Sequence, residues 1–296
     1  MDALLSGQLL VAALVTGALY ALTALGLNLV YGTMRLLNVA HGDLVMIGAY
    51  VAFWAFTLLA LSPLLGLVAA AALAALFGLA LYHGLFRRLL AGGKAAQRLE
   101  ANSLLLFFGV SVIVQNLMAL QFTATPRGYQ YLDTVYRWGN AAITGNRVAA
   151  FAVAVILCGG VLAFLRFHVT GLAIKALIQR RDAAAIVGVN VERVQQLALC
   201  LGFASAAVAG ALVSMTEQIS PFMGFPFTIA AFVVIILGGL GNITGGIAAG
   251  LLLGVLETYG VALTSSAYRS ILVYGVFVLI LLLRPQGLLG GRRIVR

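Results

Sequence analysis

The side chains that could do chemistry are few and scattered along this sequence. The three histidines, His41, His83 and His168, stand far apart, and no string has the spacing of a zinc-binding His-Glu-x-x-His or a Gly-x-Ser-x-Gly nucleophile. The string GGKA at 92–95 lacks the earlier glycine and the Ser or Thr of a phosphate-binding loop. We therefore predict no catalytic residues, no metal site and no cofactor, and no ATP hydrolysis on that motif.

Ionisable groups within apolar segments are the remaining candidates, because each is costly in lipid. His41 and Asp43 flank Gly42 at the start of an apolar segment. At the shallow depth expected for this position, a capping or interfacial role is favoured over a proton relay. Asp43 is expected to cap the helix that follows by accepting hydrogen bonds from its first amides.

Glu257 is an acidic residue inside the apolar segment 245–262, near the end of that segment. It either faces a substrate path or pairs with Arg269, and pairing is the favoured alternative. Glu217 stands among polar neighbours and is expected to be solvated.

The elements that must position these residues are apolar helices. The chain has 296 residues, of which 63% are hydrophobic and 9% charged, whereas soluble domains carry roughly 25% charged residues. This excludes a soluble enzyme, a disordered chain and a collagen, and the short alternating strands of a transmembrane barrel are not visible. The sequence predicts an all-α polytopic membrane protein, a single domain over 1–296 with about eight to nine transmembrane helices. The predicted spans are 8–30, 43–61, 64–86, 101–122, 148–165, 197–215, 227–239, 245–262 and 268–283.

The span 227–239 is short, and glycines follow it. Thirteen residues rise about 20 Å, against a hydrocarbon thickness of about 30 Å. The region near 227–245 is therefore either a broken helix that lines a cavity or a tilted helix that ends in a tight turn. Glycines at four-residue spacing leave one face of the next span bare, which favours close helix packing. The predicted packing glycines are Gly238, Gly239, Gly241, Gly245, Gly246 and Gly250.

Basic segments give the expected orientation. The net charge of +10 is attributed to cytoplasmic loops rather than to a nucleic-acid partner. The segments 87–100, 166–196 and 284–296 are rich in Lys and Arg, and an even number of spans separates each from the next. All three are therefore predicted to be cytoplasmic, with the N-terminus outside. The segment 123–147 is then external although it holds three arginines.

The segment 166–196 is longer than a turn between two spans requires. Its 31 residues include a helix-compatible stretch over 173–187, in which apolar and charged positions mix. One interpretation is an amphipathic helix on the anionic inner leaflet. The other is a docking helix for a cytoplasmic partner, and the residues alone leave both open.

Four strings in order along the chain resemble a known family. The segment 28–43, NLVYGTMRLLNVAHGD, is similar to the signature of bacterial branched-chain amino acid ABC transporter permeases. The string GGLGNITGG at 238–246 resembles their glycine motif, with Asn-Ile-Thr where the family has Ser-Ile-Pro. The segment 175–194 resembles their coupling segment, and RPQGL at 284–288 their C-terminal motif.

The resemblance implies a passive pathway in the bacterial inner membrane that is driven by other subunits. These are a second permease subunit, two cytoplasmic ATP-binding subunits docked on the coupling segment and a periplasmic substrate-binding protein. Arg180 stands where the family often has an acidic residue, so a compensating acidic patch on the ATPase is expected. The coupling residues implied are Lys175, Gln179, Arg180, Arg181, Asp182 and Gly188.

The expected function is therefore that of a permease subunit moving branched-chain or related amino acids, and not that of an enzyme. The residues predicted to line the substrate pathway are Asn28, Asn38, His41 and Glu257. Small polar residues in spans also hold helices together, which is the alternative role for the asparagines. The competing function is a stand-alone, ion-coupled secondary transporter, which would need an essential acid in mid-membrane.

Overall fold

The computed structural model describes residues 7–87, 99–138, 141–283 and 287, and most of them are helical. Each of the nine predicted spans contains a helix, and eight helices are long and apolar enough to cross a membrane. The all-α polytopic fold is thus confirmed.

The elements are α1 (Gly7–Met34), α2 (His41–Leu59), α3 (Pro63–Leu81) with a π-helical turn (Tyr82–Phe86), α5 (Leu99–Phe122), β1 (Val135–Trp138), β2 (Ala141–Thr144), α6 (Gly145–Phe167), α7 (Val169–Gln179), α8 (Arg181–Ile186), α9 (Val191–Ser214), α10 (Gly224–Gly238), α11 (Ile243–Leu263), a 3-10 turn (Ser266–Tyr268) and α12 (Arg269–Leu283).

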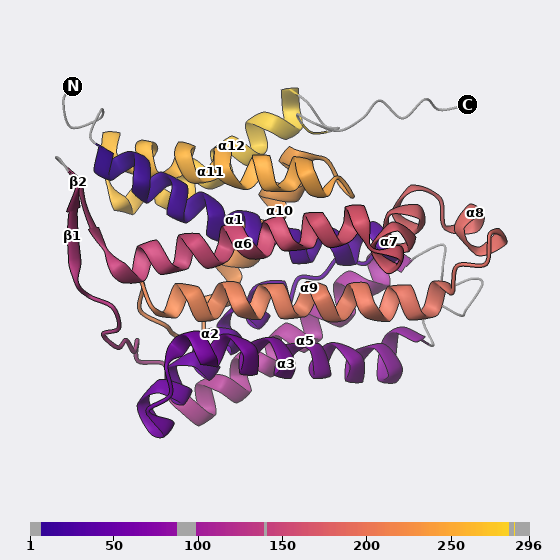
Figure 1. The fold of residues 1–296 in the computed structure, drawn as a ribbon, viewed down its shortest axis with the longest axis horizontal. Coiled ribbons are helices and arrows are strands. Elements are labelled where there is room, and N and C mark those ends of the chain that lie inside the picture. The colour runs from indigo at the N-terminus through magenta and orange to yellow at the C-terminus, as the bar shows by residue number, and fades with distance from the viewer. Residues whose placement is uncertain (1–6, 88–98, 139–140, 284–286, 288–296) are drawn as a thin grey trace.

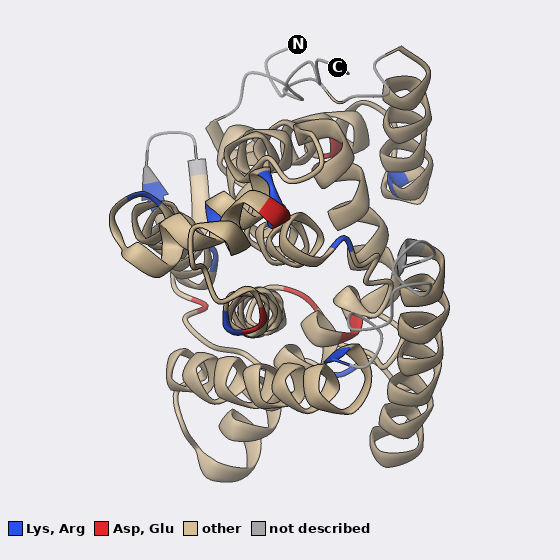
Figure 2. Ribbon diagram, turned by 90° about the vertical axis from the view of Figure 1, so that its right-hand side faces the viewer, with Lys and Arg blue, Asp and Glu red and all other residues tan. Residues whose placement is uncertain are grey.

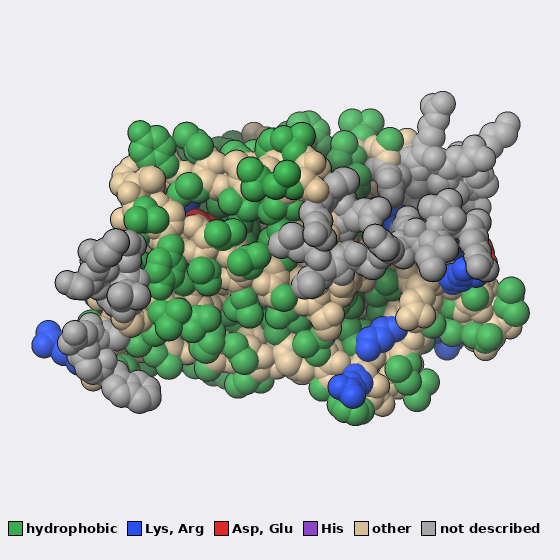
Figure 3. Space-filling view, turned by 90° about the horizontal axis from the view of Figure 1, so that it is seen from above, with side chains coloured by type: hydrophobic (Ala, Val, Ile, Leu, Met, Phe, Trp, Pro, Cys, Tyr) green, Lys and Arg blue, Asp and Glu red, His purple; other side chains and the backbone are tan. Residues whose placement is uncertain are grey.

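The long helices run along one axis of the molecule, so that its two ends differ (Figure 1). The hairpin β1–β2 lies at one end, and α7 and α8 lie at the other. Seen from the α8 end, α9 stands end-on near the middle of the bundle (Figure 2), and it packs on α1, α2 and α3. Hydrophobic side chains cover the long face, while Lys and Arg side chains gather toward the α8 end (Figure 3).

Helices α1 and α11 pack backbone against backbone. A Cβ atom placed on Gly254 would lie 2.3 Å from the Cα atom of Gly17, and one on Gly250 would lie 2.6 Å from the Cα atom of Ala21. Neither position has room for a side chain, because real Cβ atoms do not approach other atoms so closely. The bare glycine face of α11 therefore brings these two helices, which are distant in sequence, into direct contact.

The glycine string after α10 forms a tight turn. Helix α10 has 15 residues, and Gly239 and Gly241 take positive φ values of 92° and 82° before α11 begins at Ile243. Gly241 lies beside Gly32, two residues from the end of α1. Of the two alternatives for this region, the structure thus has the tight turn at a helix end rather than a break in mid-helix.

The segment between α5 and α6, expected as a plain loop, contains the hairpin. Strands β1 and β2 pair antiparallel, with Val135 opposite Thr144. Earlier in the same segment, Arg127 and Ile219 exchange two main-chain hydrogen bonds of 2.9 and 2.8 Å. This bridge ties the segment to the connection between α9 and α10.

Candidate functional site

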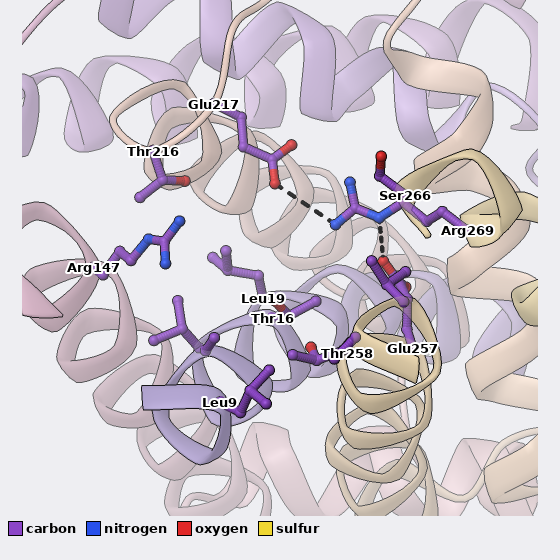
Figure 4. Close-up of a pocket in the computed structure, with 14 residues that line it drawn as sticks. Leu9, Thr16, Leu19, Arg147, Thr216, Glu217, Glu257, Thr258, Ser266 and Arg269 are labelled. Carbon is purple, nitrogen blue, oxygen red and sulfur yellow. Dashed lines mark hydrogen bonds and ion pairs between the residues drawn. The ribbon is translucent and has the colours of Figure 1, made fainter. Parts of the chain in front are cut away.

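A cavity of about 430 Å³ opens at the hairpin end of the molecule (Figure 4). It lies between the first turns of α1, the last turns of α11, the start of α6 and the segment after α9. We call it the hairpin-end cavity. Its charged lining residues are Arg147, Glu217, Glu257 and Arg269. Its aliphatic lining residues are Leu9, Ala12, Val15, Leu19, Val261 and Ala262.

Glu257 is fixed in the wall of this cavity by two partners. Glu257 is only 2% exposed. The hydroxyl of Tyr20 donates to its carboxylate at 2.6 Å, and the Nε atom of Arg269 donates to the other carboxylate oxygen. The pairing with Arg269 that was the favoured alternative is thus present, and the residue lines the cavity as well.

Glu217 is closer to a charged partner than expected. Its carboxylate lies 3.9 Å from the Nη2 atom of Arg269, and about half of its side chain is exposed. The expectation that it is merely solvated is therefore wrong. Because the connection after α9 turns back over the cavity, it brings Glu217 next to α12, which the local sequence does not indicate.

Arg147 is a residue that the sequence analysis did not single out as a site residue. In Figure 4 its guanidinium points into the hairpin-end cavity from the start of α6. Among the residues that the structure describes, no ion pair or hydrogen bond holds this guanidinium. Arg127 differs, since it donates to the carbonyl oxygen of Phe122 at 3.0 Å and lies over the ring of Trp54. The available sequence signal was a segment, predicted to be external, that holds more arginine than the outer side of a membrane favours.

The start of α2 lies deep in the molecule rather than at a shallow depth. The Nε2 atom of His41 donates to the carbonyl oxygen of Thr23 at 2.8 Å, and His41 is fully buried. Thr23 lies eleven residues before the end of α1, which is about 16 Å along that helix. The expectation of an interfacial His41 is wrong because the segment after α1 folds back along the helix before α2 begins.

The N-termini of α2 and α10 meet at this depth. The amide of Gly42 donates to the hydroxyl of Thr228 at 2.9 Å, and a Cβ on Gly42 would lie 1.8 Å from the carbonyl oxygen of Gly224. The two helices therefore approach each other through backbone at their first turns. The positive ends of the α2 and α10 helix dipoles therefore lie in the protein interior, where they favour a negatively charged group.

Asp43 supplies that negative group and does not cap α2. The helix begins at His41, so that Asp43 lies within the first turn, and no cap hydrogen bond is present. Its carboxylate accepts from the Nε2 atom of Gln115 on α5 at 2.9 Å and lies beside Gly224. The capping prediction is therefore wrong. Four side-chain atoms of this stretch are buried without a hydrogen-bond partner among the described residues: Asn38 Oδ1 and Nδ2, His41 Nδ1 and Asp43 Oδ2.

Asn28 holds the turn between α10 and α11. Its amide nitrogen donates to the carbonyl oxygen of Asn242, and its oxygen accepts from the amide of Gly241, both at 2.8 Å. The side chain of Asn242 in turn caps α11 by accepting from the amide of Gly245 at 3.0 Å. Of the four predicted pathway residues, only Glu257 lines the hairpin-end cavity, while Asn28, Asn38 and His41 are buried in the interior.

The stretch 173–187, expected as one helix, is broken at Arg180. Arg180 has extended backbone, with φ −151° and ψ 107°, and it ends α7 and begins α8. Helix α7 buries Ile174 and Leu177 against the bundle. The side chain of Ile178 reaches both Gly32 of α1 and Gly241 of the glycine turn.

Helix α8 projects at the end opposite to the hairpin (Figure 1). The six residues implied for coupling are all exposed: Lys175, Gln179, Arg180, Arg181, Asp182 and Gly188. Ile186 and Val187 are apolar and yet 85% and 76% exposed. Gly188 has a φ of 87°, which favours glycine and ends the helix. The basic string at 92–95 and the C-terminal motif lie outside the described residues, except Gly287, which packs on the α10 end next to Ile236 and Gly239.

Comparison with known proteins identifies the family. The family described as the branched-chain amino acid transport system permease component matches residues 9–281. The chain belongs to this permease family. It is 33% identical to the permease protein BraD of a high-affinity branched-chain amino acid transport system in Pseudomonas aeruginosa, over 96% of this chain and 95% of the relative.

Two relatives from Escherichia coli extend this result. The permease is 31% identical to LivH over 93% of this chain and 92% of the relative. It is 28% identical to LivM over 92% of this chain and 68% of the relative, and both carry the description of a high-affinity branched-chain amino acid transport system permease. No solved structure matches the chain significantly. The permease is thus a multi-pass membrane component of a transport system, in a family whose systems include a second permease.

Proposed function

We propose that this permease is the membrane-spanning subunit of an ATP-driven importer of branched-chain or related amino acids in the bacterial inner membrane. It works with a second permease subunit, two cytoplasmic ATP-binding subunits and a periplasmic substrate-binding protein. Within the single domain, the 166–196 segment receives an ATP-binding subunit. The observation that carries this proposal is the projecting α8 with its exposed apolar residues, set at the end opposite to the hairpin-end cavity.

The orientation that fits this role puts the N-terminus outside and the C-terminus in the cytoplasm. More of the described Lys and Arg side chains lie toward the α8 end than toward the hairpin end (Figure 3), as expected for the cytoplasmic end of a membrane protein. Arg87 and Glu192 form an ion pair of 3.0 Å, which joins the end of the π-helical turn after α3 to the start of α9 at this same end. The hairpin-end cavity then faces the periplasm, the side from which a binding protein delivers substrate.

Docking of a protein on α8 explains its exposed apolar residues better than a helix lying on lipid. A surface-bound helix buries its apolar face in the membrane. Here the apolar face of α7, with Ile174 and Leu177, already packs on the bundle. Ile186 and Val187 stand beyond this packed face, where a groove on a partner would remove them from water.

A displacement of α7 would reach the far end through direct contacts. Ile178 touches the turn that Asn28 holds, and the same turn begins α11. Because α11 packs on α1 without intervening side chains, the two helices can shift only together. Glu257, near the far end of α11, lies in the wall of the hairpin-end cavity. Movement of an ATP-binding subunit is thus transmitted to the cavity, because α1 and α11 move together as a rigid body between two packing arrangements.

The competing function, a stand-alone ion-coupled carrier, needs an acid that is free to take up and release a proton in mid-membrane. The pairing of Glu257 with Arg269 and its hydrogen bond from Tyr20 argue against that role. An ABC permease needs no such acid. The two functions separate experimentally, because only the carrier transports without ATP.

The test is co-purification from native membranes in mild detergent, followed by reconstitution. We expect two ATP-binding subunits and a second permease to elute with the tagged chain, and uptake to require ATP. The substitution Ile186→Glu should release the ATP-binding subunits and stop uptake without lowering the amount of permease in the membrane. Val169→Glu is the matched control, since Val169 is 79% exposed at the same end but lies at the start of α7. A lone chain that transports after reconstitution, or normal assembly of the Ile186→Glu variant, would contradict the proposal.

A further inference from the structure

We infer that the hairpin-end cavity is a binding site for an aliphatic amino acid in its zwitterionic form, in which Arg147 receives the carboxylate and Glu217 the ammonium group. This inference rests on the proposed function, because it names the place where the permease itself meets its substrate. The volume of about 430 Å³ is within the range of small-molecule sites.

The charges around the cavity match a zwitterion. Two arginines and two glutamates line it, so that their formal charges cancel. Glu257 and Arg269 are engaged with each other, and Glu257 also accepts from Tyr20. Glu217 lies 3.9 Å from Arg269, longer than a hydrogen bond, and Arg147 has no ionic partner among the residues described. Arg147 is therefore a cation without an ionic partner, and Glu217 is an anion held only by its 3.9 Å approach to a guanidinium that Glu257 already engages, which suits a ligand with one charge of each sign.

The apolar part of the lining suits an aliphatic side chain. Leu9, Ala12, Val15 and Leu19 recur every three or four residues, which places them on one face of α1 in the wall of the cavity. Val261 and Ala262 of α11 complete this wall. A ligand held by its two charges would place its side chain against these residues, where burial of apolar surface is favourable.

Arg147 is exposed and has none of the partners that hold Arg127 and Arg269 in place. It is the third residue of α6, where a positive charge opposes the helix dipole. It also lies at the end of the molecule that we place outside, where positive charge is disfavoured. Arg127 is fixed by Phe122 and Trp54, and Arg269 by Glu257, whereas Arg147 points into the cavity. An anionic group in the cavity would compensate both unfavourable terms.

The carboxylate and ammonium contacts make distinct demands on the ligand. Arginine binds a carboxylate through two parallel hydrogen bonds, so that an amide in its place loses the contact. The Glu217 carboxylate accepts from an ammonium group and gains nothing from a ligand that lacks one. Glu257 and Arg269 act as positioning residues, because their ion pair holds Arg269 beside Glu217 in the cavity wall.

The test measures binding of tritiated L-leucine to the purified complex of both permeases and the ATP-binding subunits, without the binding protein. L-Leucine should displace the label, while L-leucinamide and 4-methylpentanoate should compete at least tenfold less well. Arg147→Gln and Glu217→Gln should each weaken binding about tenfold or more, and Arg147→Gln should remove the preference for L-leucine over L-leucinamide. Arg137→Gln is the control, because Arg137 is an exposed arginine on β1 at the same end and does not line the cavity.

Uptake with the binding protein, measured on the same preparations, separates this inference from the proposed function. If the wild-type complex drives uptake with ATP but binds no L-leucine, or if Arg147→Gln and Arg137→Gln bind it equally, the cavity is not a substrate site and the proposed function stands. If no ATP-binding subunit is present and uptake needs no ATP, the proposed function fails. Binding of L-leucine to the lone chain, sensitive to Arg147→Gln, would still support the site.

Discussion

Asn28 donates a hydrogen bond of 2.8 Å to the main-chain carbonyl oxygen of Asn242, although 214 residues separate them. The same side chain accepts from the amide of Gly241. A single buried amide thus fixes the turn between α10 and α11 to α1. Ile178 of α7 also contacts that turn, at Gly241. Residues from three distant parts of the chain converge where the proposed coupling movement enters the bundle.

Replacement of Asn28 by alanine should destabilise the permease. The change leaves the half-buried amide of Gly241 without its partner, at about 1–3 kcal/mol, while the carbonyl of Asn242 loses one of its two hydrogen bonds and keeps that from the amide of Gly246. We expect a lower midpoint of thermal unfolding in detergent and weaker ATP-driven uptake. Asn116→Ala is the control, since the amide of Asn116 bonds within α5 at an exposed position. Equal midpoints for the two variants would show that the Asn28 contacts contribute nothing.

Alanine should have different effects on stability at Gly254 and at Gly109. The new Cβ at Gly254 would lie 2.3 Å from Gly17, whereas nothing lies within 4 Å of one at Gly109. Overpacking costs about 1–3 kcal/mol, while alanine in place of a helical glycine with free space around its Cβ position is favourable by about 1 kcal/mol. Gly254→Ala should therefore lower the unfolding midpoint and Gly109→Ala should leave it unchanged or raise it. A stable Gly254→Ala protein would mean that α1 and α11 separate easily.

The two partners of the Glu257–Arg269 pair should differ in their effect on stability. Arg269→Gln leaves the carboxylate of Glu257 buried with only Tyr20 to compensate it, whereas Arg269 is half exposed and can be hydrated once Glu257 is replaced. Arg269→Gln should hence lower the unfolding midpoint more than Glu257→Gln. The double variant should be less destabilised than the sum of the two, as a double-mutant cycle would show. Strict additivity would mean that the pair contributes no coupling energy.

Cysteine labelling should report the proposed orientation. In a background with Cys158→Ala and Cys200→Ala, Arg137→Cys on the hairpin and Ala185→Cys on α8 both place an exposed thiol at an end of the molecule. A membrane-impermeant thiol reagent should label residue 137 in intact spheroplasts, and residue 185 only after the membrane is permeabilised. The reverse pattern would overturn the orientation and would put the hairpin-end cavity in the cytoplasm.

The sequence predicted the helices well because hydropathy alone determines which segments can lie in lipid. The predictions failed where three-dimensional packing determines the position of a residue. The depth of His41 depends on how the segment after α1 folds back, and hydropathy gives no information on that path. The break at Arg180 falls within a run of good helix formers, and nothing in the run indicates it. Arg147 was counted only as a loop charge, because its approach to Glu217 and α1 requires the folded chain.

The contact between α1 and α11 also has a consequence for the order of events during synthesis. Asn28 enters the membrane early, and its partner Asn242 is made 214 residues later. At roughly 5–20 residues per second, the ribosome needs roughly 10–40 s to supply it. During that interval the first helix holds a polar amide whose final partners do not yet exist. Packing of α11 on α1 is therefore a late step of biogenesis. A nascent chain that stops before α11 leaves α1 without its partner helix, and quality-control proteases can recognise such an unpaired helix.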